Sequence, residues 1–435
     1  MSANSADHLA PIDVATGGVA LNKESLAAAL DSANDAVLLA SVVMATGRFD
    51  LIDRYTPSID YPTTPYAPAK LPEPLAGELH DLAVSVFSTE QSPERMTTMQ
   101  PEEFRRLTDL VVGYSLPDEY MPFLADQAGF DSFRRYVPVT RMPSSDVRVA
   151  IIGAGMAGIA TAIALSRRGF SYTIFEESGD IGGTWRLNNY PGVAVDTSSV
   201  YYSYSYHQNP EWTHHFPVGH QYRDYLHEVV RKWGVLDNVV FNAPVRKMRW
   251  DEQASEWAIT VGGPDGGWEE RFTAVVPAAG YLNSPKFVAA PGRDVFAGTQ
   301  FHTTHWPESL DLQGKRVAII GAGATAVQIV NEIIGDVASL AVYQRQPHWV
   351  MPNSGDTRIP EGGRWLLANV PYYSEWTRLR TSWMIGDSLY TVVRYDHEWV
   401  KSHDVSISPL NDMMMQAALA HIDSVFGLDS ELGRK

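Results

Sequence analysis

The chain has 435 residues, more than one ordinary hydrophobic core holds, and so predicts two or three domains. Its 34 basic and 51 acidic residues give a formal net charge of −17, a field that repels nucleic-acid phosphates and anionic lipid surfaces. The sequence has no cysteine, which excludes disulfides, thiolate nucleophiles and cysteinyl zinc or iron–sulfur sites, so redox chemistry has to depend on a bound cofactor.

The N-terminal residues do not resemble a targeting segment. Residues 1–19 include Asp7 and Asp13 and lack the basic and apolar regions of a signal peptide. The mostly apolar run at 36–45 is too short to span a bilayer. We therefore expect a cytoplasmic protein without nucleic-acid or membrane partners.

Residues 1–145 form the first predicted domain, a helical extension without a glycine fingerprint. Leu26, Leu30 and Val37 recur at roughly helical spacing, and Pro101 followed by two glutamates is typical of a helix start. The segment 57–74 holds six prolines, which favours a semi-rigid loop over regular structure.

A change of pattern near residue 146 marks the start of an α/β region. A strand at 147–152, a glycine turn, a helix and a strand at 172–175 follow one another, and this alternation predicts a parallel sheet with crossover helices. One glycine of the turn allows the tight bend, one lets the backbone approach a pyrophosphate at the helix N-terminus, and one allows close packing of helix on strand. These positions are Gly153, Gly155 and Gly158.

The strand at 172–175 ends at an acid. Glu176 lies 23 positions after Gly153, where a carboxylate can accept hydrogen bonds from the adenosine ribose of a dinucleotide. A glycine turn that binds no ligand is the alternative interpretation. We predict that residues 146–295 are the first part of an FAD-binding Rossmann domain.

The same unit returns at residue 316, with strands at 316–320 and 340–343 on either side of a glycine turn and a helix. Arg345 lies 24 positions after Gly321, at the place that matches the ribose acid. A guanidinium there can bind a 2′-phosphate through paired charge-assisted hydrogen bonds, although a solvated arginine is the alternative. Residues 316–435 are thus predicted to be an NADPH-binding domain with a site formed by Gly321, Gly323, Thr325, Ala326, Gln344 and Arg345.

Two such units in series predict two cofactors, with hydride passing from the second to the first. The fold class is therefore α/β, with two Rossmann-like domains for FAD and NADPH preceded by the helical extension. This order resembles the two-dinucleotide flavoproteins, which include disulfide reductases and flavin monooxygenases. A disulfide reductase needs a pair of redox cysteines, so the resemblance favours the monooxygenases.

The segment 296–315, between the two units, carries a more specific pattern. It matches the FxGxxxHxxxWP signature of type I Baeyer–Villiger monooxygenases at every fixed position, namely Phe296, Gly298, His302, Trp306 and Pro307. The alternative interpretation is an interdomain packing cluster in which His302 is a core histidine. Even under the resemblance we interpret the segment as a linker and assign His302 no acid–base role.

A second match begins at Gly182-Gly183-Thr184-Trp185 and continues through Asp196 to Tyr202. It resembles the segment that wraps the flavin in these enzymes. The resemblance implies that Thr184, Trp185 and Tyr202 contact FAD and that Asp196, the one predicted catalytic residue, lies between flavin and nicotinamide. A turn-forming aspartate is the alternative, and Asn189 stands where many members have arginine.

The long extension resembles the subgroup of 4-hydroxyacetophenone monooxygenase. This implies a homodimer formed through the extension, and conversion of an aryl ketone to an ester with O₂ through a flavin C4a-peroxide. The family's Lys-Arg pair and the C-terminal segment of the flavin lobe are not found before Lys435, so we expect a chain that lacks the C-terminal part. The alternatives are an N- or S-oxygenating flavin monooxygenase and a catalytically silent dinucleotide-binding module.

Beyond Pro352 the sequence is rich in aromatic residues and predicts helices. Four of its apolar residues share one helical face, which is more typical of a core than of a ligand pocket. They are Tyr372, Trp376, Leu379 and Trp383.

Overall fold

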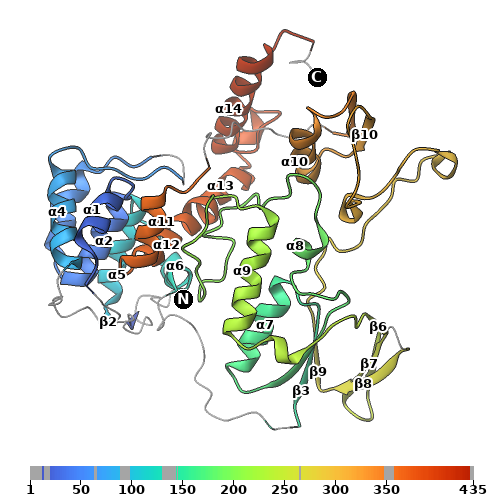
Figure 1. The fold of residues 1–435 in the computed structure, drawn as a ribbon. Helices are drawn as coiled ribbons and strands as arrows, with labels where there is room; N and C mark the ends of the chain where they lie inside the picture. Colours follow the sequence, from blue (N-terminus) through green and yellow to red (C-terminus); the bar gives the residue numbers. More distant parts are fainter. Residues whose placement is uncertain are drawn as a thin grey trace. The chain divides into compact units, whose positions relative to one another are not determined.

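The computed structural model describes residues 12–13, 20–62, 66–88, 98–129, 144, 146–263, 266–346 and 357–431. The chain divides into two compact units, and each is built from separate stretches (Figure 1). The helical unit comprises Met1–Arg135, Thr197–Phe216 and Trp349–Lys435, and the α/β unit comprises Tyr136–Asp196 and Pro217–His348. In the described part, no helix combines the length and apolarity needed to cross a membrane.

The helices predicted for the N-terminal extension are present. Asn34 caps one of them, since its side chain accepts a hydrogen bond from the Val37 amide, and Gly47 ends the same helix with φ +69°. Residues 57–62 and 66–74 contain a short 3₁₀ turn and an isolated bridge between Asp60 and Lys70. The helices are α1 (Lys23–Leu30), α2 (Asp35–Thr46), α3 (Asp50–Tyr55), α4 (Leu75–Phe87), α5 (Pro101–Val112) and α6 (Met121–Ala128), and β1 (Ile12–Asp13) pairs with β2 (Thr98–Met99).

Helices from the C-terminal part complete the core of this unit. α11 (Glu361–Asn369) and α12 (Tyr373–Ile385) pack among the N-terminal helices, where Figure 1 shows them in orange beside blue ones. The ring centroids of Trp376 and Phe104 are 5.8 Å apart, and Trp376 Nε1 donates to Met44 Sδ. All four residues of the aromatic face are buried, so the core interpretation is confirmed.

This grouping differs from the domain division expected from the sequence. That division placed residues 357–385 in the same domain as the second glycine turn, whereas the structure packs them with the extension. The reason is the large apolar area of α2 and α5, which the N-terminal helices alone leave uncovered. The remaining helices of this part are α13 (Tyr390–Val393) and α14 (Pro409–Phe426).

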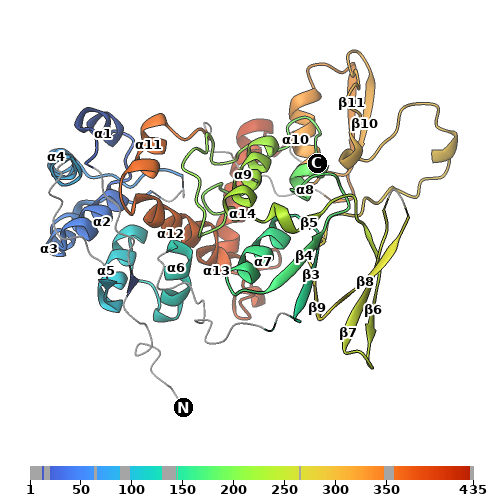
Figure 2. The same ribbon diagram turned by 60° about the horizontal axis from the view of Figure 1, so that its bottom comes forward.

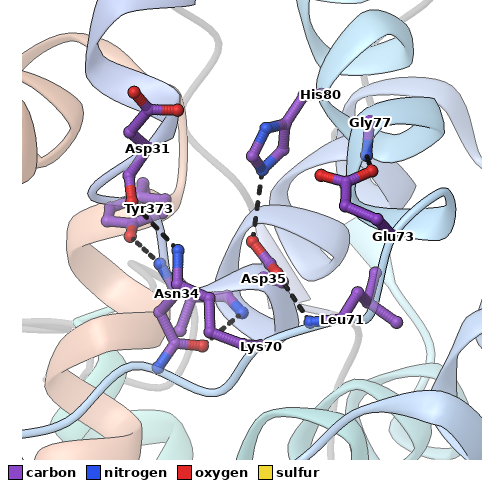
Figure 3. Close-up of polar contacts among 10 residues, drawn as sticks. Asp31, Asn34, Asp35, Lys70, Leu71, Glu73, Gly77, His80 and Tyr373 are labelled. Carbon is purple, nitrogen blue, oxygen red and sulfur yellow. Dashed lines mark hydrogen bonds and ion pairs between the residues drawn. The ribbon is translucent and has the colours of Figure 1, made fainter.

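A polar cluster fixes the start of α2 inside this core (Figure 3). The fully buried Asp35 carboxylate accepts a hydrogen bond from the Leu71 amide (2.7 Å) and contacts His80 Nε2 (3.3 Å). The preceding Asn34 amide donates to the Tyr373 hydroxyl on α12 (2.8 Å). A buried carboxylate is costly unless it is hydrogen-bonded, and these contacts meet that need while joining α2 to α4 and α12.

The α/β unit contains the predicted parallel sheet. Its strand order is β5-β4-β3-β9, all parallel, and α7 (Met156–Ser166) makes the crossover from β3 to β4 and covers one face of the sheet (Figure 2). Figure 2 shows α9 (Gly219–Lys232) above α7 in that view. The strands are β3 (Arg148–Ile152), β4 (Ser171–Phe175), β5 (Val239–Val240) and β9 (Ala274–Pro277).

An antiparallel sheet that the sequence analysis did not predict lies next to the parallel one. Its strands are β6 (Val245–Asp251), β7 (Glu256–Val261) and β8 (Trp268–Phe272), in that order. Phe272 packs edge-on against Phe175, with ring centroids 5.7 Å apart, and so joins the cores of the two sheets.

The second predicted βαβ unit is also present. β10 (Arg316–Ile320) and β11 (Ser339–Tyr343) pair in parallel, and α10 (Ala324–Ile333) connects them. Ile329 and Ile333 of α10 are buried with Tyr190, which comes from the first half of the α/β unit. The two-dinucleotide architecture expected from the sequence is confirmed.

Candidate functional site

The first glycine turn follows β3 at the carboxyl edge of the parallel sheet. Gly153 has φ +102°, a conformation that favours glycine, and its amide donates to the Phe175 carbonyl (2.8 Å). A Cβ on Gly158 would lie 1.9 Å from the Gly153 carbonyl oxygen, so only glycine lets α7 start this close to the turn. The first backbone amides of α7 have no acceptor within the helix, which is the arrangement that binds pyrophosphate in dinucleotide-binding folds.

A second glycine turn meets the first. Gly183 has φ +53°, and a Cβ there would lie 3.0 Å from the Gly155 Cα. Gly183 directly precedes α8 (Thr184–Leu187), which contains the exposed Thr184 and the half-buried Trp185. The structure therefore brings together the two motifs that the sequence assigned to FAD.

Glu176 follows β4 directly and stands beside the first turn. Its buried carboxylate accepts hydrogen bonds from the Ala154 amide (2.7 Å), the Ser178 amide (2.9 Å) and the Ser178 hydroxyl (2.8 Å). A carboxylate has about four acceptor positions, so one stays open for a ribose hydroxyl. The three bonds also fix the orientation of the carboxylate before any ligand binds.

The second turn repeats this arrangement with less packing around it. Gly321 has φ +120°, and its amide donates to the Tyr343 carbonyl (2.8 Å), as Gly153 does to Phe175. Nothing lies within 4 Å of a Cβ added at Gly321 or Gly323. Thr325 and the buried Ala326 lie in the first turn of α10, so an alanine fits the third position of this motif.

Gln344 and Arg345 follow β11 and are exposed. Because the Gly321 amide bonds to the Tyr343 carbonyl as the Gly153 amide bonds to the Phe175 carbonyl, Gln344 stands in the position that Glu176 occupies in the first unit, and Arg345 is the next residue. Among the residues described by the structure, Arg345 has no ion-pair partner. Opposite charges therefore follow the two corresponding strands, with Arg345 one position further along than Glu176.

The signature segment has mixed surroundings. Trp306 is half-buried against the core around Tyr190 and Ile329, and its ring contacts Phe301 with centroids 5.1 Å apart. Phe296 is 61% exposed and lies over Gly298, where a Cβ would come within 2.5 Å of its ring.

His302 belongs to the same segment and makes local contacts. Its Nδ1 accepts a hydrogen bond from the Thr304 amide (3.2 Å), and burial, reinforced by His305, lowers its pKa. Pro307 follows Trp306, and its carbonyl accepts from the Leu310 amide. Trp306 therefore packs as the alternative interpretation of this segment expects, whereas Phe296 is exposed and does not.

Asp196 and Tyr202 fall in different units. Asp196 is exposed and is the last residue of the α/β unit before Pro217, whereas Tyr202 is half-buried in the helical unit. The Tyr202 amide donates to the Ser198 carbonyl (2.7 Å). Tyr202 thus belongs to a different unit from Asp196, Glu176 and the glycine turns.

His215, which the sequence analysis did not single out, lies in the same stretch of the helical unit as Tyr202. Its ring centroid is 4.9 Å from that of Tyr66, and its amide donates to the Thr357 carbonyl. Burial, reinforced by the neighbouring His214, lowers the pKa of His215.

This lowered pKa predicts a loss of stability in acid. As pH falls below about 6.5, the unfolded chain takes up a proton at this position while the folded chain does not, so unfolding is favoured until the folded pKa is reached. We expect the melting temperature to fall more between pH 7.5 and 5.5 for the wild type than for His215→Gln. The control variant is His220→Gln, because His220 is exposed and should leave the pH dependence of the melting temperature unchanged. If the melting temperature falls equally with pH in the wild type and in His215→Gln, His215 is not the group responsible.

Two βαβ repeats, each with a glycine turn at the carboxyl end of its first strand, define an α/β protein of the double dinucleotide-binding class. The family model described as flavin-binding monooxygenase-like matches residues 146–417, and the chain belongs to this family.

Curated relatives extend this result. The chain is 31% identical over 422 residues to an uncharacterized monooxygenase, y4iD, of Sinorhizobium fredii, covering 93% of this chain and 61% of the relative. It is 43% identical over 210 residues to a Baeyer–Villiger monooxygenase of Streptomyces coelicolor, covering 47% of this chain and 39% of that enzyme. The chain therefore spans less than two-thirds of the length of either relative.

A solved structure supports the fold. The crystal structure of OTEMO in complex with FAD and NADP superposes with a TM-score of 0.52 at 24% identity, over 65% of this chain and 58% of that one. At this identity, the likeness shows the shared architecture alone.

Proposed function

We propose that the chain is an FAD- and NADPH-dependent Baeyer–Villiger monooxygenase that inserts one oxygen atom from O₂ next to a ketone carbonyl. The observation that carries this proposal is the pair of opposite charges that follow two corresponding strands, Glu176 directly after β4 and Arg345 two residues after β11. The matches to enzymes named Baeyer–Villiger monooxygenases support it. The resemblance to 4-hydroxyacetophenone monooxygenase points to an aryl ketone and an ester product.

The first site fits FAD. The turn at Gly153, Gly155 and Gly158 provides the pyrophosphate cradle that a side chain would fill, and Glu176 keeps an acceptor position for the ribose. Thr184 and Trp185 stand directly after the turn that meets this cradle. A flavin bound there supplies hydride acceptance and the activation of dioxygen.

The remaining assignments for the first site rest on resemblance. Tyr202 is assigned a flavin contact. Asp196 is assigned the orientation of the nicotinamide carboxamide or of a nearby arginine.

The second site fits NADPH. The open backbone of Gly321 and Gly323 leads into the N-terminus of α10, which attracts a pyrophosphate, and Thr325 adds a hydroxyl to the same turn. Gln344 and Arg345 flank the ribose position, where the guanidinium would bind the 2′-phosphate. This chemistry selects NADPH over NADH.

Removing this guanidinium should change the cofactor preference. We expect Arg345→Ala to raise the KM for NADPH by about 10- to 100-fold, because hydrogen bonds to a charged group contribute about 1.5–3 kcal/mol. The KM for NADH should stay within about twofold, because NADH has no 2′-phosphate. Steady-state NAD(P)H oxidation with added FAD measures both.

Arg316→Ala is the matched control. This exposed arginine lies at the opposite end of β10 from the glycine turn, so its removal should leave both KM values unchanged. Equal losses for NADPH and NADH in Arg345→Ala would remove the basis for the NADPH assignment.

Product analysis tests the activity itself. The chain with FAD, NADPH and ¹⁸O₂ is expected to convert an aryl methyl ketone to an ester that carries one ¹⁸O atom. Sulfoxide from an aryl thioether, with the ketone unchanged, would support an N- or S-oxygenating enzyme instead. Failure of NADPH to bleach added FAD would support a silent dinucleotide-binding module.

The resemblance also supports a homodimer formed through the N-terminal extension. Light scattering after size-exclusion chromatography tests this, with a mass of twice 48.2 kDa as the expected value. A monomer over the concentrations used for catalysis would contradict it.

A further inference from the structure

Strand β6 forms one edge of the antiparallel sheet in the α/β unit (Figure 2). It pairs with β7 on one side, and within the described part of the chain no strand pairs with it on the other. Five consecutive residues, Arg246–Trp250, are exposed, so both faces of the strand are accessible as well as its edge. Such an edge presents unpaired backbone N–H and C=O groups, and a further strand can add to it.

One face of β6 is basic. Lys247 and Arg249 lie two positions apart, so their side chains leave the same face of the sheet. They stand opposite Thr260 and Ala258 of β7, which carry no charge. Among the residues that the structure describes, neither cation has an ion-pair partner, although the chain as a whole has a formal net charge of −17. Charge complementarity therefore favours carboxylates as the groups that meet this face.

The other face of β6 is apolar. Met248 and Trp250 stand opposite Ile259 and Trp257 of β7, and the ring centroids of the two tryptophans are 5.6 Å apart. Ile259 is fully buried in the core of this sheet, whereas Met248 is 41% exposed and Trp250 is 40% exposed. Apolar side chains of a strand added beyond β6 would cover these two residues.

From this arrangement we propose that β6 is a docking edge for an acidic segment of a partner protein, which adds to the sheet as a fourth strand. Successive side chains of a strand point to opposite faces, so the segment that fits alternates acidic with apolar residues. Its acidic residues meet Lys247 and Arg249, and its apolar residues meet Met248 and Trp250. A second β6 fits poorly, because a register that aligns the two apolar faces also places cations opposite cations.

Peptide titration tests the proposal. The probe is a fluorescein-labelled peptide that alternates glutamate with valine, and binding is followed by fluorescence anisotropy. The control peptide has the same residues in two blocks, glutamates first and valines after, and so keeps the charge without the alternation. We expect the alternating peptide to bind at least about tenfold more tightly than the block peptide. Equal affinities, or no binding of the alternating peptide, would overturn the proposal.

Matched charge variants test which cations the peptide meets. Lys247→Gln combined with Arg249→Gln should weaken binding of the alternating peptide about five- to tenfold, because two cross-strand charge pairs are lost. The control combines Arg231→Gln with Lys232→Gln, which removes two neighbouring exposed cations from the end of α9 and should change the affinity less than about twofold. All four side chains are exposed, so both variants should keep the wild-type melting temperature. Equal losses in the two variants would show attraction by overall charge and contradict a site on β6.

Hydrogen exchange locates the bound peptide. The β6 amides that do not face β7 should exchange at least about tenfold more slowly in the complex, while α7 amides keep their rates. Unchanged exchange in β6 would rule out strand addition, whatever the affinity. Protection of β6 that rises with the concentration of the chain alone would place a second copy on this edge, in conflict with an acidic partner. Self-association of the Lys247→Gln, Arg249→Gln variant, without peptide binding by the wild type, would assign the two cations to preventing edge-to-edge aggregation instead.

Discussion

Gly158→Ala is expected to lower FAD affinity by at least about 100-fold, which corresponds to about 2.7 kcal/mol. The added Cβ would lie 1.9 Å from the Gly153 carbonyl oxygen, and the Ala278 carbonyl oxygen lies 2.8 Å from where a Cβ on Gly153 itself would stand. Backbone surrounds the site, so neither the helix nor the turn can move without breaking the cradle. Quenching of flavin fluorescence during titration measures the loss.

Gly323→Ala is the matched control in the second glycine turn. Nothing lies within 4 Å of its Cβ position, so the melting temperature and FAD affinity should stay at their wild-type values. NADPH binding should weaken, because the backbone at this position approaches the pyrophosphate. Wild-type FAD affinity in Gly158→Ala would refute the assignment of the cradle.

Trp376→Ala is expected to destabilise the helical unit by about 3–5 kcal/mol, the usual cost of removing a large buried aromatic side chain. Trp376 is fully buried, stacks on Phe104 and donates its indole N–H to Met44 Sδ. The cavity would open between α12 and the N-terminal helices. Hydrogen exchange of α2 and α5 amides should accelerate, while α7 amides in the other unit keep their protection.

The control for this variant is Trp268→Ala on β8. This tryptophan is 39% exposed, and its loss should change stability by less than about 1 kcal/mol. Protection of α2 that is unchanged in Trp376→Ala would show that the extension folds without α12.

The sequence predicted the two βαβ units closely because their signals are local. The strands before the two turns share the residues Arg-Val-Ala-Ile-Ile, and positive φ at Gly153 and Gly321 follows from the motif itself. The strand ends at Glu176 and Arg345 were predicted for the same reason, since their distance along the chain from each turn is set by one helix and one strand.

Contacts between distant parts of the chain were not predictable in this way. The Arg378 guanidinium on α12 donates to the Val200 carbonyl, 178 positions away in the sequence, and no periodic pattern links a helical arginine to a turn carbonyl. The aromatic face of α12 was identified as core, but its sequence does not say which helices it covers. The strands β6 to β8 were not predicted, because no glycine fingerprint marks them in the sequence.

The helical unit combines residues 1–135 with residues 349–435, and most of the α/β unit lies between them in the sequence. The two parts of its core are therefore synthesised at different times. The N-terminal helices leave the ribosome first, yet Trp376 and its neighbours follow some 250 residues after residue 129, tens of seconds later at about 5–20 residues per second. During that interval the apolar faces of α2 and α5 are not yet packed against α12. Exposed apolar surface of this kind favours aggregation, so we expect the yield of folded protein to depend on the speed of translation.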